Sequence, residues 1–392
     1  MTNDFNNSYT SESSRCLHCA KPTCREACPL NNDVPRFLQL VSDGKFDEAV
    51  QVVGHPFGEI CGFVCPHDAH CHGGCVLSKR GRGVKMGEVE RAVFAQHPYK
   101  VERKTLTDSK KNGLKVAVVG GGVSGLTCAV KLFEQGADVT VFERDELLST
   151  LKLIPDFRLP KEAIERVLNA VDGKFKVVKK DVNFDDMQLT DLYDAVYVAT
   201  GASQLYTLGV EGEEFATPYD EFLRSDKHCG RVVVIGGGNT AMDCARLAKR
   251  SGCEVTVAYR RTRDDMPAFN KEIEDAYGDG VKFEYNLAPI KLEQKDGKLL
   301  LTLAKTVSEG RGKLTVTDET VEVECDTVVS ALGSRFDKKV FGSQGDTFNQ
   351  DNPRNPQHKL YVGGDALRAS TVVNAVADGL KAAKEILCLS TK

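Results

Sequence analysis

The chain has 392 residues, a length that corresponds to two to four domains of about 100–200 residues each. Its residues are 41% hydrophobic and 28% charged, and a net charge of −4 excludes the excess of Lys and Arg on which nucleic-acid binding depends. Residues 1–14 are polar, unlike a signal peptide, and no segment approaches the ~20 apolar residues of a membrane span. We therefore expect a cytoplasmic protein with neither a membrane span nor a nucleic-acid partner, in which clustered cysteines indicate metal or redox chemistry.

The cysteines are concentrated near the N-terminus: eight of the 14 lie within the first 75 residues. The first run is Cys16-x2-Cys19-x4-Cys24-x3-Cys28-Pro29. It is close to the ferredoxin pattern of closely spaced thiolates followed by a cysteine before proline, which in two-cluster ferredoxins ligates the other cluster. The second run is Cys61-x3-Cys65-x5-Cys71-x3-Cys75. Two cubane clusters would use all eight thiolates, so the spacing predicts two iron–sulfur clusters in a small helical domain.

Zinc is the alternative interpretation, because His18, His67, His70 and His72 lie near these cysteines and could complete tetrahedral sites. Zinc sites usually pair two short ligand spacings, whereas each run here has its cysteines at ferredoxin-like intervals, which favours iron–sulfur. We interpret the other six, scattered cysteines as small buried hydrophobic residues.

A short basic stretch follows the second run, with the sequence Lys79-Arg80-Gly81-Arg82-Gly83-Val84-Lys85. Its length and its glycines favour a solvated loop. The alternative is a docking site for an acidic partner.

A dinucleotide-binding motif follows a polar linker at roughly residues 100–113. Residues 115–119 predict a buried strand, and an amphipathic helix to Gln135 and a second strand ending at Glu143 come next. The turn between the first strand and the helix is Gly120-Gly-Gly122-Val-Ser-Gly125. This is a Rossmann fingerprint: the glycines let the backbone approach a pyrophosphate, the helix N-terminus offers N–H groups, and Glu143 can accept hydrogen bonds from a ribose.

The same unit returns 116 residues later, and 12 of 30 positions are identical between 115–144 and 231–260. The second turn is Gly236-Gly-Gly238-Asn239-Thr240-Ala241. Glu143 aligns with Tyr259, which Arg260 and Arg261 follow. Guanidinium groups bind a 2′-phosphate, which an acidic residue would repel. The first unit therefore favours FAD and the second NADPH, with NADH possible; the alternative is that both arginines are only solvated.

Three later segments fit a flavin fold. Residues 194–201 predict a strand running into a turn at Thr200-Gly201, and residues 326–333 repeat this exit as far as Gly333. Gly364-Asp365 then precede a helix that begins near Thr371. We expect Asp365 to bind the FAD ribitol and the helix N-terminus to stabilise negative charge on reduced flavin. The predicted fold is α/β: a helical two-cluster iron–sulfur domain followed by two nested Rossmann-like dinucleotide-binding domains.

These features together resemble the small subunit of bacterial glutamate synthase and the N-terminal half of dihydropyrimidine dehydrogenase, over residues 15–383. The motifs that carry the resemblance are Arg15-Cys-Leu-His-Cys19, Cys61-Gly-Phe-Val-Cys65-Pro66, Phe157-Arg158-Leu159-Pro160, Gly236-Gly-Gly-Asn-Thr-Ala-Met-Asp243, Tyr259-Arg260-Arg261 with Met266-Pro267, and Gly363-Gly364-Asp365. The resemblance implies two [4Fe-4S] clusters in residues 1–110, FAD in 111–227 and 328–392, and NAD(P)H in 228–327. It also places FAD beside the segment that contains Arg158.

The resemblance changes the ligand set that spacing alone predicts. It implies that Cys61 is not a ligand and that Glu90 completes the second cluster. One cluster would then be held by Cys16, Cys19, Cys24 and Cys75, and the other by Cys28, Cys65, Cys71 and Glu90.

The chain departs from the family's pattern at one place near the flavin. Members usually have a Gly-Gly pair ahead of the segment that contains Arg158, where this chain has Leu147 and Leu148. Leucines there must either turn away and push the loop outward or fill space that the flavin would occupy. We predict that FAD still binds, through a rearranged 145–153 loop that seals it less tightly.

We expect an oxidoreductase subunit in which NADPH passes hydride to FAD and the clusters carry single electrons to a partner. The cofactors supply the chemistry, so we name no catalytic acid or base. The partner would be a separate catalytic subunit in a glutamate synthase-like hetero-oligomer. The alternatives are the electron-input subunit of a dihydropyrimidine dehydrogenase-type or electron-bifurcating complex, a self-contained disulfide or quinone reductase, and a zinc-stabilised redox sensor without turnover.

Overall fold

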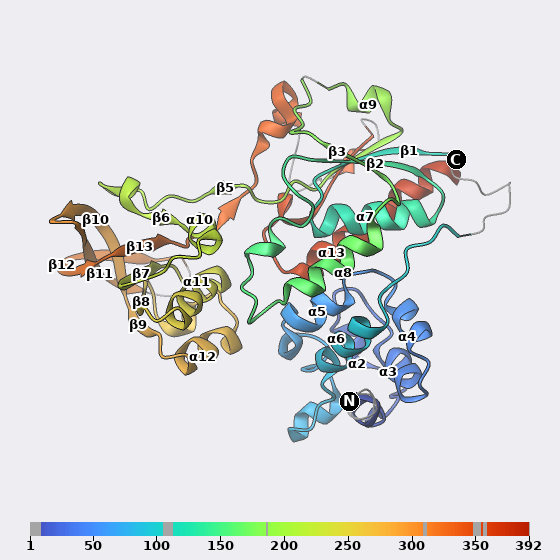
Figure 1. Ribbon diagram of the computed structural model, residues 1–392, viewed down its shortest axis with the longest axis horizontal. Helices are drawn as coiled ribbons and strands as arrows, with labels where there is room; N and C mark the ends of the chain where they lie inside the picture. Colours follow the sequence, from blue (N-terminus) through green and yellow to red (C-terminus); the bar gives the residue numbers. More distant parts are fainter. Residues whose placement is uncertain are drawn as a thin grey trace. The chain divides into compact units, whose positions relative to one another are not determined.

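A computed structural model describes residues 9–104, 113–185, 187–308, 312–347, 354–355 and 359–391 (Figure 1). The chain forms two compact units. The first comprises Met1–Lys152, Asp156–Ser203 and Phe336–Lys392, and the second comprises Leu153–Pro155 and Gln204–Arg335. Within the described ranges, no helix has both the length and the apolar content needed to cross a membrane.

The N-terminal part of the first unit is a cluster of short helices. They are α2 (Thr23–Glu26), α3 (Val34–Ser42), α4 (Phe46–Val53), α5 (Gly58–Val64) and α6 (Met86–Gln96), with 3₁₀ turns η1 (His67–Ala69) and η2 (Val76–Arg80). Asp33 caps α3 by accepting a hydrogen bond from Arg36 N, and Pro35 lies in the first helical turn, where its missing N–H costs nothing. The apolar faces of these helices form one core around Phe37, Val89 and Phe94.

A six-stranded sheet follows in the same unit, in the order β15-β16-β4-β1-β2-β3. Its strands are β1 (Lys115–Val119), β2 (Asp138–Glu143), β3 (Lys176–Lys179), β4 (Ala195–Val198), β15 (Arg354–Asn355) and β16 (Leu360–Val362). All pairings are parallel except that between β15 and β16. The helices of this part are α7 (Val123–Glu134), α8 (Lys161–Val171), α9 (Leu189–Leu192) and α13 (Val372–Leu387). The C-terminal helix α13 crosses α7 so closely at Gly379 that a Cβ there would overlap the Ser124 carbonyl oxygen.

The second unit contains a five-stranded parallel sheet in the order β6-β13-β7-β8-β9. Its strands are β6 (Thr217–Pro218), β7 (Arg231–Ile235), β8 (Glu254–Tyr259), β9 (Lys282–Tyr285) and β13 (Thr327–Ser330), and its helices are α10 (Tyr219–Arg224), α11 (Asn239–Arg250) and α12 (Asn270–Gly278). An antiparallel sheet of β10 (Leu287–Lys295), β11 (Lys298–Ser308) and β12 (Leu314–Cys325) is inserted before β13. The chain enters and leaves this unit through a pair of short strands, β5 (Gln204–Leu205) and β14 (Ser334–Arg335).

The two copies of the sequence repeat have matching structures. The bounds of β1, α7 and β2 become those of β7, α11 and β8 when 116 is added to each residue number. Gly120 and Gly236 have φ values of 106° and 148°, and a Cβ at either would overlap the carbonyl oxygen of Ala199 or Ala331. Only glycine satisfies both requirements. The prediction of two nested Rossmann-like folds after a helical domain is confirmed.

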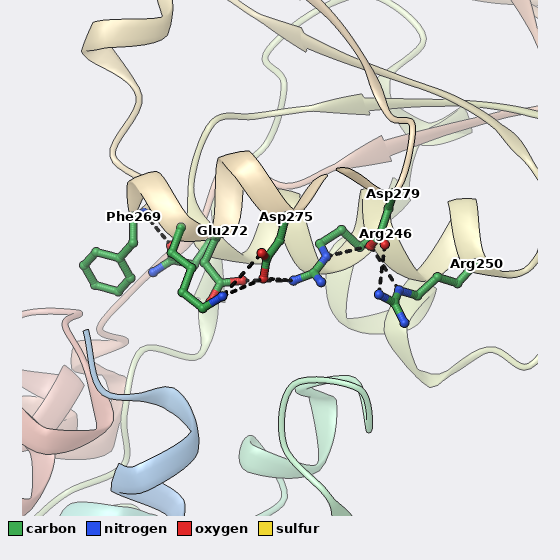
Figure 2. Close-up of polar contacts among 8 residues, drawn as sticks. Arg246, Arg250, Phe269, Glu272, Asp275 and Asp279 are labelled. Carbon is green, nitrogen blue, oxygen red and sulfur yellow. Dashed lines mark hydrogen bonds and ion pairs between the residues drawn. The ribbon is translucent and has the colours of Figure 1, made fainter. Parts of the chain in front are cut away.

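A buried arginine joins the two helices α11 and α12 of the second unit (Figure 2). Arg246 is only 7% exposed and pairs with Glu272 and Asp275 at 3.3 Å and with Asp279 at 2.8 Å. Arg250 reaches Asp279 at 2.8 Å. A buried guanidinium is tolerated when its donors are paired in this way, and the pairing holds α12 against α11.

Within the first unit, the cysteine-bearing helices share a core with the six-stranded sheet's helices. Val130 of α7 and Val171 of α8 belong to the same core as Phe37 and Phe94. Glu59 of α5, 3% exposed, accepts two hydrogen bonds from Arg166 of α8, at 2.7 and 2.6 Å. The two parts are therefore held in a defined orientation by apolar packing and by a buried bidentate ion pair.

Candidate functional site

Four thiols, together with the Cys71 thiol, line one cavity in the N-terminal region. The four belong to Cys16, Cys19, Cys24 and Cys75. Burial and the neighbouring Cys16 and Cys75 thiols raise the pKa of Cys24 to about 11. The remaining wall is largely apolar and includes Val34, Leu38 and Met86. A set of thiols in apolar surroundings fits an iron–sulfur cluster, because thiolates ligate the iron and the surrounding shell limits solvent access.

A second group gathers around Glu90 of α6, which is 5% exposed and whose pKa burial raises to about 8. Burial raises the pKa values of Cys65 and Cys71, and the nearby Glu90 and Cys28 add to both shifts. Cys61 lies in the same group: burial raises its pKa well above the usual range, with Glu90 and the three other thiols contributing. The structure thus brings together five candidates where one cubane cluster takes four.

The histidines considered for zinc are placed differently from one another. His67 contacts the Cys71 Sγ through Nδ1 at 3.4 Å and the Cys61 carbonyl oxygen through Nε2 at 3.1 Å. His72 pairs with Asp68 at 2.8 Å. Among the residues that the structure describes, no group of three or more His, Cys, Asp or Glu side chains is arranged to hold a single metal ion. The sequence analysis missed the His67–Cys71 contact, for which the only signal was the four-residue spacing.

In the FAD-type fold, the Gly-rich turn lies next to open space. A Cβ at Gly122, the N-cap of α7, would have no atom within 4 Å. The Glu143 carboxylate at the end of β2 accepts hydrogen bonds from Gly121 N at 2.6 Å and Asp145 N at 2.8 Å. These two bonds orient the carboxylate and leave it further acceptor capacity for a ribose. The turn and the helix N-terminus fit a dinucleotide pyrophosphate.

The segment around Gly364-Asp365 packs onto the beginning of α7, where a Cβ at Gly364 would contact Ser124. Burial raises the pKa of Asp365 to about 6. Ser370 N, which donates to its carboxylate at 3.1 Å, opposes this rise, and the charge of Asp378 adds a smaller increase. Asp378 itself accepts from Gly364 N at 3.0 Å. The fold therefore brings this aspartate close to the first Gly-rich turn. Neither Asp378 nor Ser124 was among the predicted residues.

Four other predicted flavin residues lie in the same unit. Thr371 caps α13 by accepting a hydrogen bond from Asn374 N at 3.3 Å. Thr200 and Gly201 follow β4, and Arg158 is half-buried three residues before α8.

The loop with two leucines packs inward. Leu148 is 1% exposed, and its N–H donates to the Gly121 carbonyl oxygen at 3.0 Å. Its φ of 58° lies in the left-handed region that glycine usually supplies. The Leu147 side chain covers Gly121 beside the Glu143 carboxylate. The loop thus keeps a glycine-like backbone at Leu148 while burying the leucine side chain, and it is not pushed outward.

The second unit repeats this arrangement with different side chains. A Cβ at Gly238 or Gly333 would again meet open space, and Thr240 is half-buried in the first turn of α11. Asn239 Oδ1 accepts a hydrogen bond from Phe269 N at 2.9 Å, and Ala268 N donates to the Gly237 carbonyl oxygen at 3.0 Å. The segment after β8 is therefore fastened along the Gly-rich turn.

The residues at the end of β8 take the place that Glu143 has in the first unit. The Tyr259 ring covers Gly237, and its hydroxyl donates to the Asp265 carbonyl oxygen at 2.8 Å. Arg260 is exposed and Arg261 is half-buried. A ring and two guanidinium groups at this position suit a phosphorylated ribose better than a carboxylate does.

Comparisons with known proteins match the cysteine-rich N-terminal region and the dinucleotide-binding folds to two known families. Residues 2–101 match the family described as dihydropyrimidine dehydrogenase domain II, 4Fe-4S cluster, and residues 114–379 match the pyridine nucleotide-disulphide oxidoreductase family. The chain is 32% identical to the glutamate synthase [NADPH] small chain of Escherichia coli, over 96% of this chain and 90% of that protein. It is 30% identical to the NADPH-Fe(3+) oxidoreductase subunit beta of Geobacter sulfurreducens, over 79% of this chain and 50% of that protein. The thioredoxin reductase of Lactococcus lactis has a similar fold, with a TM-score of 0.57 and 17% identity, over 71% of this chain and 99% of that one.

Substitution of Leu148 tests its backbone strain. Any truncation loses buried apolar contacts and should cost about 2–5 kcal/mol of unfolding free energy. Leu148→Gly also removes the left-handed strain, whereas Leu148→Ala keeps it, so the glycine variant should be the more stable by about 1 kcal/mol. Denaturant unfolding of the FAD-free protein measures both. An alanine variant as stable as the glycine variant would show that this backbone is not strained.

Proposed function

Because this chain belongs to the family of pyridine nucleotide-dependent iron–sulfur oxidoreductases that includes the glutamate synthase small chain, we propose that it delivers electrons from NADPH to a separate catalytic subunit. It is an NAD(P)H-dependent oxidoreductase with a 4Fe-4S domain and an FAD- and NAD(P)-binding domain. One observation carries the proposal: both cysteine groups and the FAD-type turn lie in a single packed unit. In this proposal residues 1–110 bind the clusters, 111–227 and 328–392 bind FAD, and 228–327 bind NADPH.

FAD, when bound, accepts two electrons as a hydride and can release them singly, which suits one-electron clusters. The chain's part is to bind and orient it. The N–H groups of the turn from Gly120 to Gly122 and of the first turn of α7, which contains Gly125, hold the pyrophosphate, and Glu143 accepts from the ribose. Asp365 orients the ribitol, and the N-terminus of α13 at Thr371 supplies partial positive charge. The remaining residues assigned to FAD are Arg158, Thr200 and Gly201.

The second unit selects the nicotinamide nucleotide. Gly236, Gly238, Asn239 and Thr240 hold the pyrophosphate at the N-terminus of α11, and Gly333 leaves room at the end of β13. We assign the 2′-phosphate to Arg260 and Arg261. The Asn239–Phe269 hydrogen bond and the Arg246 pairs keep the strand end, the turn and α12 in one rigid arrangement.

We assign Cys16, Cys19, Cys24 and Cys75 to one [4Fe-4S] cluster, and Cys28, Cys65, Cys71 and Glu90 to the other. The cavity that all four thiols of the first set line supports this set, with Cys71 of the second set also at its wall. Glu90 supports the second, because a buried carboxyl that affects the pKa of each of these three thiols is placed as a ligand would be.

The relatives are named as a small chain and a beta subunit, and such names belong to multi-subunit enzymes. We extend this to a hetero-oligomer in the cytoplasm, in which the partner receives the electrons and carries the terminal reaction. A glutamate synthase-type partner is the first candidate, since that relative matches nearly the full length of both chains.

The isolated holoprotein tests the proposed function directly. It should reduce an artificial acceptor such as a tetrazolium dye with NADPH, because its cofactors need only an electron sink. It should make no glutamate from glutamine and 2-oxoglutarate, since that chemistry belongs to the partner. Anaerobic assays of dye reduction and amino-acid formation measure both, and glutamate production by the pure chain would contradict the proposal.

Neutralising the two arginines tests nucleotide selection. Each charge-assisted hydrogen bond to phosphate contributes about 1.5–3 kcal/mol, so Arg260→Gln/Arg261→Gln should weaken NADPH at least about tenfold. NADH binding should hardly change, because NADH has no 2′-phosphate. Steady-state kinetics with NADPH and with NADH measure how far the variant's preference between the two nucleotides changes. The control is Arg231→Gln/Lys282→Gln, which removes two cations at the first residues of β7 and β9, at the opposite end of the strands from Arg260. Equal losses of NADPH and NADH binding would assign Arg260 and Arg261 to the fold.

Iron content tests the ligand assignment. Glu90→Ala should lose or alter one cluster, whereas Cys61→Ser should keep iron near about eight atoms per chain, because Cys61 is not a ligand. Cys128→Ser, a buried thiol of α7 outside both groups, is the matched control. Iron analysis and electron paramagnetic resonance of the reduced protein give the result, and cluster loss only in Cys61→Ser would restore the all-cysteine set.

A further inference from the structure

The two cysteine groups differ in their access to solvent. Cys61, Cys71 and Glu90 of the second group are buried, and its Cys28 and Cys65 are partly exposed. Every cysteine of the first group is partly exposed. Two large apolar side chains that line the first group's cavity are exposed as well, Leu17 at 60% and Val76 at 40%. Single exposed apolar residues are common, but these two share the opening of a redox cavity.

Three cations lie directly after this apolar opening. Val76 begins η2, which follows Cys75 and ends with Lys79 and Arg80, and Arg82 comes two residues later. All three cations are exposed. No ion pair with them occurs among the described residues, whereas Arg15 pairs with Glu12 and Lys85 pairs with Glu88. On a chain with a net charge of −4, this surface has the opposite sign to the whole.

The basic segment is fastened to the first cysteine group, which distinguishes it from an unattached solvated loop. Arg15, the residue before Cys16, donates to the Arg82 carbonyl oxygen at 2.5 Å. Lys85 N donates to Glu12 Oε1 at 2.8 Å. Residues 82–85 are thus held against the segment that leads into Cys16, and the positive charge has a fixed place beside the cavity.

We propose that Leu17, Val76, Lys79, Arg80 and Arg82 form a docking face for an electron-transfer protein whose own redox centre lies in an acidic surface. The inference rests on the proposed function, in which electrons leave this chain for a partner, and we take the first cysteine group as the exit because all four of its thiols are partly exposed. Fixed cations steer an acidic partner toward the face and raise its association rate, and the apolar pair gives the desolvated centre of the contact. This reverses the sequence-based interpretation of residues 79–85 as a solvated loop.

Charge reversal tests the face with two haem proteins of opposite surface charge. The holoprotein is reduced with dithionite, freed of excess reductant and mixed anaerobically with the acidic soluble domain of cytochrome b5 or with basic cytochrome c. Because dithionite replaces NADPH, a failure of NADPH reduction would concern the proposed function and not this face. The variant is Lys79→Glu/Arg80→Glu/Arg82→Glu, which changes exposed side chains only. The matched control is Lys176→Glu/Lys179→Glu/Lys180→Glu on and beside the edge strand β3.

Electron transfer to cytochrome b5 should fall at least about tenfold in the variant and rise with cytochrome c, with salt suppressing both differences. The control should leave both rates near wild type. Calorimetric titration of the oxidised holoprotein with cytochrome b5 gives an independent measure, and the variant should bind at least about tenfold more weakly. Equal effects of variant and control, or unchanged transfer in a variant with full iron content, would overturn the proposal. So would charge-dependent binding to phosphatidylserine vesicles without binding to cytochrome b5.

Discussion

Arg166 donates two hydrogen bonds from α8 to the buried Glu59 carboxylate of α5, and this contact fixes how the cysteine-bearing helices sit on the flavin-type sheet. Glu59 lies two residues before Cys61 and six before Cys65 in the same short helical segment. Removing the guanidinium would leave a carboxylate uncompensated in the interior, which is costly. Since electron transfer depends steeply on distance, a rigid joint between these parts is a functional requirement as well as a structural one.

A second polar contact joins the segment after α6 to the C-terminal end of α7. Tyr99 donates to Glu134 at 2.6 Å, and Lys131 reaches the same carboxylate at 2.6 Å. Burial is the main reason that the pKa of Tyr99 is raised, and the Glu134 carboxylate adds to the effect. The polar groups at this end are thus paired with one another, and apolar packing between the helices continues around them.

The two Rossmann-like folds show how one residue position changes the use of a repeated structure. Glu143 and Tyr259 are equivalent in the repeat, and each lies against the middle glycine of its turn. The carboxylate binds the Gly121 N–H and remains an acceptor, whereas the phenol ring covers Gly237 and is followed by two arginines. The backbone is shared because glycine geometry dictates it, and in the proposed function the charge at the strand end selects the nucleotide.

Local patterns in the sequence determined the repeated strand–turn–helix units, because glycine positions and apolar periodicity act over a few residues. They also indicated two clusters, since the cysteine runs have characteristic spacing. The antiparallel sheet of β10 to β12 was not predicted, although residues 321–325 of β12 alternate apolar and polar side chains as a half-buried strand does. Spacing alone did not group Cys75 with Cys16 or Glu90 with the second thiols; the family resemblance implied both, and the tertiary structure brings these residues together. Only the tertiary structure held Leu148 in a left-handed conformation. It also fastened Arg82 beside Cys16, so that an ordinary basic loop became a fixed charged surface. Each of these outcomes depends on contacts between residues far apart in the chain or on packing that overrides local preference, which spacing and composition do not contain.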